Sequence, residues 1–260
     1  FSAKGGVGKT TIACELATFL SLTNHGKGKF RVCLVDYDLM FGDILSTLNF
    51  NPNQANMLDW IADLDKKHKA GQEWNAISYD AGQIERFLQK KEESGLYSLI
   101  APITNFDYMK ISNEEIVNLC GTMLRNIVEN GDFDFVIVDT GNNIEDATYV
   151  SLERADEILL ILTPSMNSAN CNNNFLNTMN HLEFDLSKIR IVINKAKPAK
   201  GVGISVNELQ EALKNPVTNQ PFECYAKIKD NDAVQNAENI GEPMVYKSSH
   251  EFTKSIGEVA

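Results

Sequence analysis

The sequence predicts an α/β fold: a doubly wound, mostly parallel sheet with helices on both faces. Three observations predict it. Short apolar, β-branched segments alternate with segments of helical periodicity along the 260 residues, which is typical of strands joined by helical crossovers. A glycine-rich segment precedes the first helical segment, and aspartates end two of the apolar segments. Because ligand-binding groups gather at the carboxyl ends of parallel strands, these features are expected at one edge of the sheet.

Five near-continuous apolar segments are expected to form strands covered on both faces. They comprise residues 31–35, 96–100, 133–138, 158–162 and 189–193. The clearest helix lies between the second and third of these strands, since residues 112–115 form a capping box and Gly131 is a typical stop. Its apolar face comprises Ile116, Leu119, Cys120, Met123, Leu124, Ile127 and Val128.

Other segments have simpler patterns. A second capping box at residues 205–208 precedes apolar residues at helical spacing and predicts another packed helix. Residues 51–95 are polar and irregular, and are expected to form a helical excursion on the rim of the sheet. Residues 252–260 have the pattern of a helix that is cut short. No linker rich in Ser, Gly or Pro divides the chain, so residues 1–260 are expected to form a single domain.

The composition argues against several classes of protein. The formal net charge of −11 repels DNA and anionic lipid as a whole, so there is no strong nucleic-acid signal. Lys195, Lys197 and Lys200 are either a local basic patch or a solvated loop. No apolar segment approaches the length of about 18 residues that a transmembrane helix needs. The five cysteines contain no C-x-x-C pair, which suits reduced thiols in a cytosolic protein.

The glycine-rich segment, residues 1–11, reads Phe-Ser-Ala-Lys-Gly-Gly-Val-Gly-Lys-Thr-Thr. Its glycines allow successive backbone N–H groups to point at phosphate oxygens, and the following helix adds its N-terminal dipole. Lys9 would reach the β- and γ-phosphates, and the Thr10 hydroxyl would ligate Mg²⁺. The segment therefore predicts a site for a nucleoside triphosphate and Mg²⁺. The residues expected to bind the nucleotide here are Lys4, Gly5, Gly6, Val7, Gly8, Lys9, Thr10 and Thr11.

Three aspartates are candidates to complete this site. Asp36 and Asp38 end the strand that begins at Arg31, and Asp139 ends the next long apolar segment. A lone aspartate after a strand is commonly a turn residue. Carboxylates that face a phosphate loop can instead hold the water shell of Mg²⁺ or position an attacking water. Together with the loop, they predict nucleotide hydrolysis as well as binding.

The phosphate loop departs from the usual pattern G-x-x-x-x-G-K-[ST]. Ala3 replaces the first glycine, and Lys4 directly precedes the double glycine. The loop thereby resembles the deviant Walker A loop, K-G-G-x-G-K-[ST], of the ParA/MinD ATPases. The resemblance continues, in order along nearly the whole chain, through Asp36, Asp38, Asp139, Asn194 and the segment 228–243.

The resemblance implies the P-loop fold, ATP and Mg²⁺, and a role for each matching residue. Lys4 would reach across a dimer interface to the nucleotide of the second subunit and neutralise developing charge. Asp38 would orient the water that attacks the γ-phosphate. Thr10 would bind Mg²⁺ directly, while Asp36 and Asp139 would hold its waters.

The resemblance also implies an adenine pocket, with departures from the family pattern. Asn194 would hydrogen-bond the adenine and select ATP over GTP. Lys229 and Asp230 are further candidates for base contacts, although Lys229 stands where proline usually shapes the pocket. Gly141 stands two residues after Asp139, where the family often has proline, so this switch loop is expected to move differently.

Shorter segments resemble the CpaE/TadZ branch, which helps place bacterial pilus assembly machines. Residues 35–44 resemble its D-x-D-x-x-F-G-D-V segment, residues 57–60 loosely fit its S-I-x-D-like segment, and residues 96–102 resemble its L-x-x-L-x-A-P strand. The branch implies a homodimer with ATP at its interface and a protein partner at a polar or membrane-associated assembly in the bacterial cytoplasm. It also implies a longer chain with a receiver-like domain upstream.

Alternative functions remain open. A chromosome- or plasmid-partition ATPase needs a basic surface, which the charge of −11 disfavours. A MinD-like membrane oscillator needs a C-terminal amphipathic helix with basic and bulky apolar faces. No such helix is present by Ala260, although truncation of the chain could have removed it. An iron-protein reductase needs paired cysteines near Asp139, and Cys120 and Cys171 do not match that pattern. A nucleotide-binding scaffold with little hydrolysis is consistent with Gly141.

Overall fold

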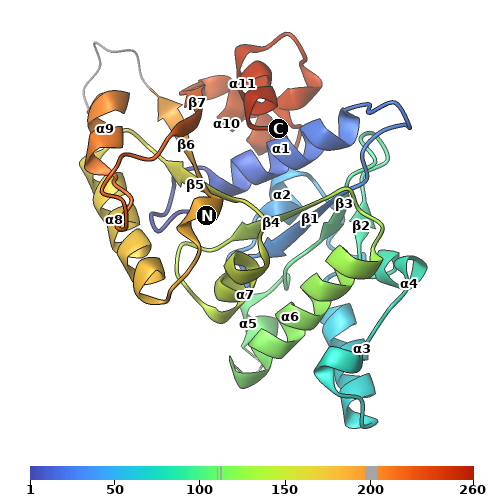
Figure 1. The fold of residues 1–260 in the computed structure, drawn as a ribbon. Coiled ribbons are helices and arrows are strands. Elements are labelled where there is room, and N and C mark those ends of the chain that lie inside the picture. Colours follow the sequence, from blue (N-terminus) through green and yellow to red (C-terminus); the bar gives the residue numbers. More distant parts are fainter. Residues whose placement is uncertain (110, 112, 197–203) are drawn as a thin grey trace.

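The computed structural model describes residues 1–109, 111, 113–196 and 204–260, and its strands form two sheets. The strands are β1 (Val32–Tyr37), β2 (Gln89–Lys90), β3 (Tyr97–Leu99), β4 (Phe135–Thr140), β5 (Ile158–Leu162), β6 (Ile189–Ala196) and β7 (Cys224–Lys229). One sheet has the order β2-β3-β1-β4 and the other β5-β6-β7. Every strand pair is parallel except β2 with β3. The predicted α/β class with mostly parallel strands is confirmed (Figure 1).

Helices cover both faces of these sheets. They are α1 (Lys9–Leu22), α2 (Ile44–Thr47), α3 (Met57–Lys69), α4 (Ala81–Glu85), α5 (Asn105–Tyr108), α6 (Asn113–Asn130), α7 (Asp146–Arg154), α8 (Met166–His181), α9 (Val206–Ala212), α10 (Asp232–Ile240) and α11 (Glu251–Val259), with short 3-10 helices η1 (Trp74–Ala76), η2 (Leu186–Lys188) and η3 (Met244–Tyr246). Alternate side chains of β1 face opposite layers. Val32 and Leu34 pack with α1 and α11, whereas Cys33 and Val35 pack with α3, α6 and α7.

The helix α1 packs against strands of both sheets. Its apolar side chains share one buried cluster with Leu34 of β1, Ile161 of β5 and Val192 of β6. On the opposite face of the three-stranded sheet, α8 and α9 form a separate cluster with β5 and β6. The N-terminus lies between the two sheets (Figure 1). There Phe1 donates from its amino group to the Leu159 carbonyl at 2.9 Å and accepts from the Ile161 N–H at 2.8 Å.

The five predicted strands are found as β1, β3, β4, β5 and β6. The predicted capping box at residues 205–208 is confirmed at the start of α9, and residues 252–260 fall in α11. The helix that ends near Gly131 is α6, although Ser112 of its predicted capping box lies outside the described residues. One residue of its expected apolar face is wrong: Val128 is 57% exposed.

Two elements lacked a clear sequence signal. The helix α8 is rich in asparagine, which is a weak helix former. It is stabilised by burial of Phe175, Leu176 and Met179 in the core. The strand β7 is a partly exposed edge strand in which only Ala226 and Ile228 are buried, so its apolar segment is short.

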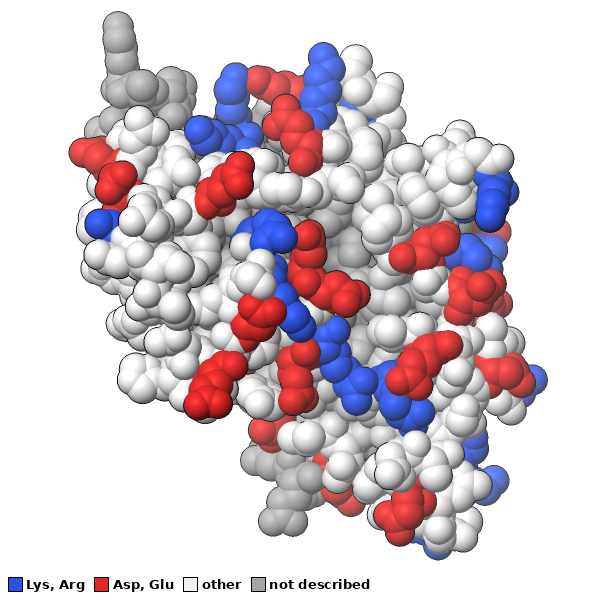
Figure 2. All heavy atoms as spheres, viewed as in Figure 1, with Lys and Arg blue, Asp and Glu red and all other residues white. Residues whose placement is uncertain are grey.

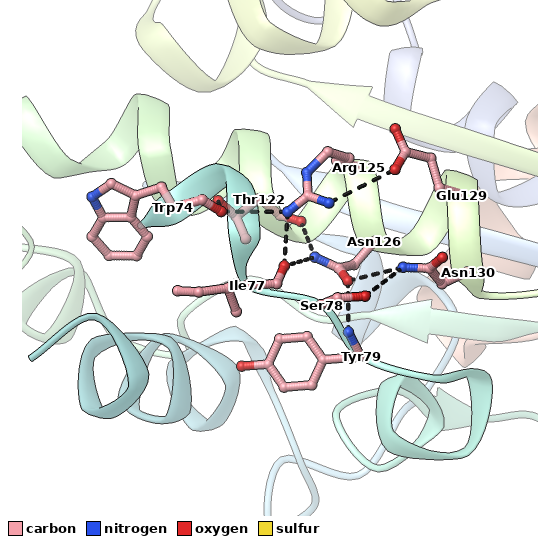
Figure 3. A network of polar contacts seen from close by, with 9 residues as sticks. All are labelled: Trp74, Ile77, Ser78, Tyr79, Thr122, Arg125, Asn126, Glu129 and Asn130. Carbon is pink, nitrogen blue, oxygen red and sulfur yellow. Dashed lines mark hydrogen bonds and ion pairs between the residues drawn. The ribbon is translucent and has the colours of Figure 1, made fainter. Parts of the chain in front are cut away.

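The excursion at residues 51–95 contains α3, η1 and α4, and ends in the short strand β2. A polar network fastens it to α6 (Figure 3). Buried Asn126 accepts the Tyr79 N–H at 2.9 Å and donates to the Ile77 carbonyl at 3.1 Å. Arg125 donates to the same Ile77 carbonyl at 2.7 Å and to the Trp74 carbonyl at 3.3 Å. The predicted helical excursion is therefore confirmed. Side chains of α6 form the hydrogen bonds of its backbone N–H and carbonyl groups at residues 74–79, where no strand pairs with it.

A buried glutamate joins α1 to the segment after α10. The two carboxylate oxygens of Glu15 accept the N–H groups of Met244 at 2.8 Å and Val245 at 3.0 Å. Burial raises the pKa of Glu15 to about 7, and the nearby charge of Glu238 adds to the rise. The hydrogen bonds from the two N–H groups lower the pKa but do not cancel this rise. The charged form of Glu15 is thus costly in the folded protein.

We predict that this cost makes stability depend on pH. Between the ordinary glutamate pKa of 4.5 and the folded value of about 7, the unfolded chain loses this proton while the folded chain keeps it. The free energy of unfolding should therefore fall by about 2–3 kcal/mol between pH 5 and pH 8, relative to a Glu15→Gln variant. Urea unfolding at several pH values measures this difference. Glu153→Gln, at an exposed position, is the control, and equal pH profiles for all three proteins would contradict the prediction.

Candidate functional site

The phosphate loop lies between Phe1 and α1, and its geometry depends on Gly8. Gly8 is the N-cap of α1 in the left-handed conformation, with φ 92°. A Cβ at this position would lie 2.5 Å from the amide nitrogen of Asn194. Only glycine satisfies both constraints. The loop therefore leads into α1 so that the unpaired N–H groups of the first helical turn form an anion site.

Two buried carboxylates lie beside this loop. Asp36 of β1 and Asp139 of β4 are direct neighbours in the parallel register, and the Thr10 hydroxyl donates to Asp139 at 2.6 Å. Burial raises the pKa of Asp139 to about 6, against the Thr10 hydrogen bond. Burial, together with the charge of Asp139, also raises the pKa of Asp36 well above its usual value. The three residues that are predicted to bind the metal, Thr10, Asp36 and Asp139, therefore lie together near the carboxyl ends of β1 and β4.

The chain after β1 folds back over Asp36. The N–H groups of Asp38 and Ile44 each donate to the Asp36 carboxylate at 3.3 Å. A Cβ at Gly42 would lie 2.5 Å from this carboxylate and 2.6 Å from the Ala101 Cβ. Gly42 is therefore required because a side chain at this position would clash with the buried Asp36 carboxylate. The sequence pattern alone did not give this reason.

Lys9 and Asp38 face the same region. Burial lowers the pKa of Lys9, and the charges of Asp139 and Asp38 partly offset the fall. Asp38 is half-buried and accepts the Phe41 N–H at 3.2 Å. Its carboxylate lies 3.7 Å from the point that a Cβ on Gly141 would occupy. The switch loop after Asp139 therefore lies against the residue that is predicted to position water.

Asn142 was not among the predicted site residues, although it lies in the same switch loop. Its amide nitrogen is 3.7 Å from the position of a Cβ on Gly5. The switch loop thus also lies beside the double glycine of the phosphate loop. Lys4, which precedes that double glycine, is half-exposed, and its backbone N–H donates to the Ser2 hydroxyl at 3.3 Å.

Asn194 and Lys195 hold the phosphate loop from the end of β6. The Asn194 amide donates to the Val7 carbonyl at 2.8 Å, and the Lys195 ammonium donates to the Gly6 carbonyl at 3.1 Å. Consecutive strand residues normally point to opposite faces. Here Lys195 has φ 54° and the register with β7 is interrupted, so both side chains reach the same loop. The contact of Asn194 with adenine stays a prediction.

The ammonium group of Lys195 is hydrogen-bonded to the phosphate loop, whereas a member of a basic patch would point into solvent. Lys197 and Lys200, its predicted partners, lie outside the described residues. Figure 2 shows basic and acidic side chains interspersed on the face drawn, rather than a broad basic surface.

The two remaining candidates for base contacts lie at the end of β7. The Lys229 ammonium is paired with the Glu251 carboxylate of α11, and the Asp230 N–H donates to the Ala196 carbonyl at 3.2 Å. This ion pair joins Lys229 to α11. The role of Lys229 toward a base stays a prediction.

The donor set fits Mg²⁺ rather than a softer metal. Thr10, Asp36 and Asp139 offer a hydroxyl and carboxylates, the hard oxygen ligands that Mg²⁺ prefers. Within the described part of the chain, no group of three or more His, Cys, Asp or Glu residues is arranged to hold a metal ion.

Comparisons with known proteins show the family to which the chain belongs. A family model described as AAA domain matches residues 1–191. The septum site-determining protein MinD of Thermotoga maritima is 23% identical over 265 residues, covering 100% of this chain and 84% of the relative. Among solved structures, a ParA family ATPase from Chlorobium tepidum has a TM-score of 0.77 at 22% identity, covering 98% of this chain and 93% of that chain. The chain belongs to the ParA/MinD family of P-loop ATPases.

A second solved structure bears on the ligand. MinD from Pyrococcus horikoshii, complexed with Mg-ADP, has a TM-score of 0.72 at 15% identity, and the match covers 99% of this chain and 91% of that chain. Nucleotide and Mg²⁺ are therefore found in the ParA/MinD fold. Among the described residues, no helix combines the length and apolar character that a membrane span requires.

The Gly8 geometry makes a testable prediction for this ParA/MinD-family loop. Gly8→Ala should lower the free energy of unfolding by about 2–4 kcal/mol, because it combines a left-handed strain with a clash on Asn194. Gly6→Ala is the matched control, since Gly6 also has a positive φ of 72° but has open space around it. It should cost about 1–2 kcal/mol. Urea unfolding measures both variants, and equal losses would show that the Asn194 contact is unimportant.

Proposed function

We propose that this protein is a slow, Mg²⁺-dependent ATPase that acts as a nucleotide-controlled dimerisation switch. The observation that carries the proposal is the pairing of Asp36 and Asp139 beside the phosphate loop, with the Thr10 hydroxyl on Asp139. Burial raises the pKa values of both carboxylates, and the neighbouring charge of Asp139 repels that of Asp36 and raises the pKa of Asp36 further. A bound cation would relieve that repulsion, which supports a divalent metal here.

We propose a separate role for each residue of the loop and for each aspartate beside it. Thr10 would contact Mg²⁺, while Asp36 and Asp139 would hold its water shell. When bound, Mg²⁺ would neutralise charge on the β- and γ-phosphates. Lys9 would bind the same phosphates, and Asp38 would orient the attacking water from its place against Gly141.

The dimer part of the proposal rests on Lys4. Its position before the double glycine gives the loop an additional cation that the usual phosphate loop lacks. We propose that Lys4 reaches the nucleotide of a second copy of the chain, so that ATP favours a face-to-face homodimer and hydrolysis releases it.

The predicted consequence is that Asp38→Ala abolishes turnover but not ATP binding. Steady-state ATP hydrolysis should fall by about 100-fold or more, as for loss of a group that positions the nucleophile. In the presence of ATP and Mg²⁺, the same variant should accumulate as a dimer in size-exclusion chromatography with light scattering. Asp65→Ala on α3, which removes a carboxylate distant in the fold from the loop, is the control.

Two results would contradict these assignments separately. Unchanged turnover in Asp38→Ala would show that this carboxylate does not position water. A monomer under every condition, with wild type and variant alike, would remove the dimer from the proposal.

For the cellular role, we propose the placement of a pilus or secretion assembly, as in the CpaE/TadZ branch. Residues 35–44, 57–60 and 96–102 support this role through their likeness to that branch. A MinD-type role in cell division is the second candidate, because the chain is similar to a septum site-determining protein over its whole length. A partner protein at a pole or at the membrane would recruit the ATPase in the first case.

Vesicle binding tests whether residues 1–260 themselves contact a membrane, as a MinD-type role would favour. The apolar face of α11, with Phe252, Ile256 and Val259, is buried against the core, so this helix is not free to enter a membrane. We therefore predict that the chain with ATP and Mg²⁺ stays unbound when vesicles of phosphatidylglycerol and phosphatidylethanolamine are sedimented. ATP-dependent cosedimentation would favour the MinD-type role instead.

A further inference from the structure

A glutamate outside the predicted site contacts the helix that begins the phosphate site. Glu238 of α10 accepts a hydrogen bond from the Thr11 hydroxyl, joining residues 227 positions apart in the sequence. Both side chains are half-buried. The contact is therefore a specific tertiary interaction and not a solvated surface pair.

Thr11 is the third residue of α1, within the turn whose N–H groups have no partner in the helix. Successive helical residues are rotated by about 100°, so Thr10 and Thr11 point in different directions. The Thr10 hydroxyl points to Asp139, on the side where the γ-phosphate is expected. The Thr11 hydroxyl points in a different direction and donates to Glu238 of α10.

Glu238 is thus an anion placed at the positive end of α1, where phosphate oxygens would also bind. It is accompanied by other acids, since Glu15, Glu238 and Glu242 line one narrow crevice with Thr11. Of these acids, Glu238 is the one that contacts Thr11 directly, and a negative charge there lowers the affinity of the site for an anion. Glu238 also accepts the hydrogen bond of the Thr11 hydroxyl, which would otherwise be free to donate to the nucleotide.

We propose that Glu238 lowers the affinity of the phosphate loop for nucleotide, because its carboxylate competes with the nucleotide phosphates for Thr11 and for the positive end of α1. The proposal rests on the proposed function in one respect, that the loop binds adenine nucleotides. Binding then requires the Thr11 hydroxyl to leave Glu238, and α10 loses a link to α1. The affinity for nucleotide is in this way coupled to the position of α10.

A purely structural role for the same contact makes a different prediction. If Glu238 only fastens α10 to α1, the isosteric Glu238→Gln change keeps an acceptor oxygen and leaves nucleotide affinity unchanged. If its charge opposes the phosphate, the same change strengthens binding. Glu242→Gln is the matched control, because it removes a charge from the same crevice at an exposed position.

The test is isothermal titration calorimetry of the wild type and both variants with ADP and Mg²⁺. Glu238→Gln should tighten ADP binding by about fivefold, and Glu242→Gln should change it by less than about twofold. Glu238→Ala, which removes charge and acceptor together, should also bind ADP more tightly than the wild type. Hydrogen exchange of the nucleotide-free proteins should show α10 equally protected in wild type and Glu238→Gln.

Failure of this proposal is distinguishable from failure of the proposed function. Unchanged or weaker ADP binding in Glu238→Gln, with the wild type binding ADP, would overturn the role of Glu238 alone. An equal gain in both Gln variants would also overturn it, because the effect would then be a general one of net charge. Absence of ADP binding in all proteins would contradict the proposed function itself.

Discussion

The close approach of Gly8 to the Asn194 amide is the contact on which the rest of the structure depends. Gly8 in its left-handed conformation sets the direction in which α1 leaves the phosphate loop. The helix then packs on strands of both sheets, so a change in its direction would disturb one large core cluster. The loop itself is held to β6 through Asn194 and to β4 through the pair of Thr10 and Asp139. It therefore joins the two sheets as well as forming the site.

The same site concentrates buried acidic charge that Lys9 offsets only in part. Asp36 and Asp139 are buried as neighbours, and Glu15 is buried on α1 with only backbone N–H donors on its carboxylate. Burial of carboxylates without a cation costs stability, because water solvates the charged form better than the protein does. Proteins commonly accept such costs where a ligand supplies the missing charge. Glu238 adds a further acid beside the first turn of α1, through its hydrogen bond from Thr11.

Much of the fold follows from sequence patterns that have a local cause. Continuous apolar segments predicted β1, β4, β5 and β6 because strands covered on both faces need no polar side. The helix α8 was not predicted, since its asparagines carry no helical preference and its stability comes from Phe175, Leu176 and Met179. Such burial is a property of the assembled core, and no window of sequence contains it.

For the site, the amino-acid sequence by itself determined the phosphate loop and the acids at the strand ends, because glycine spacing and strand termini are local features. Only the tertiary structure decided three further contacts. Lys195 donates to the Gly6 carbonyl, Glu238 accepts from the Thr11 hydroxyl, and Gly42 lies so close to the Asp36 carboxylate that a side chain there would clash. The contacts of Lys195 with Gly6 and of Glu238 with Thr11 join exposed or half-buried residues that are far apart in the chain. None of the three contacts follows a periodic pattern. Their positions depend on how α10, β6 and β1 pack around α1, which is settled when the sheets and helices assemble.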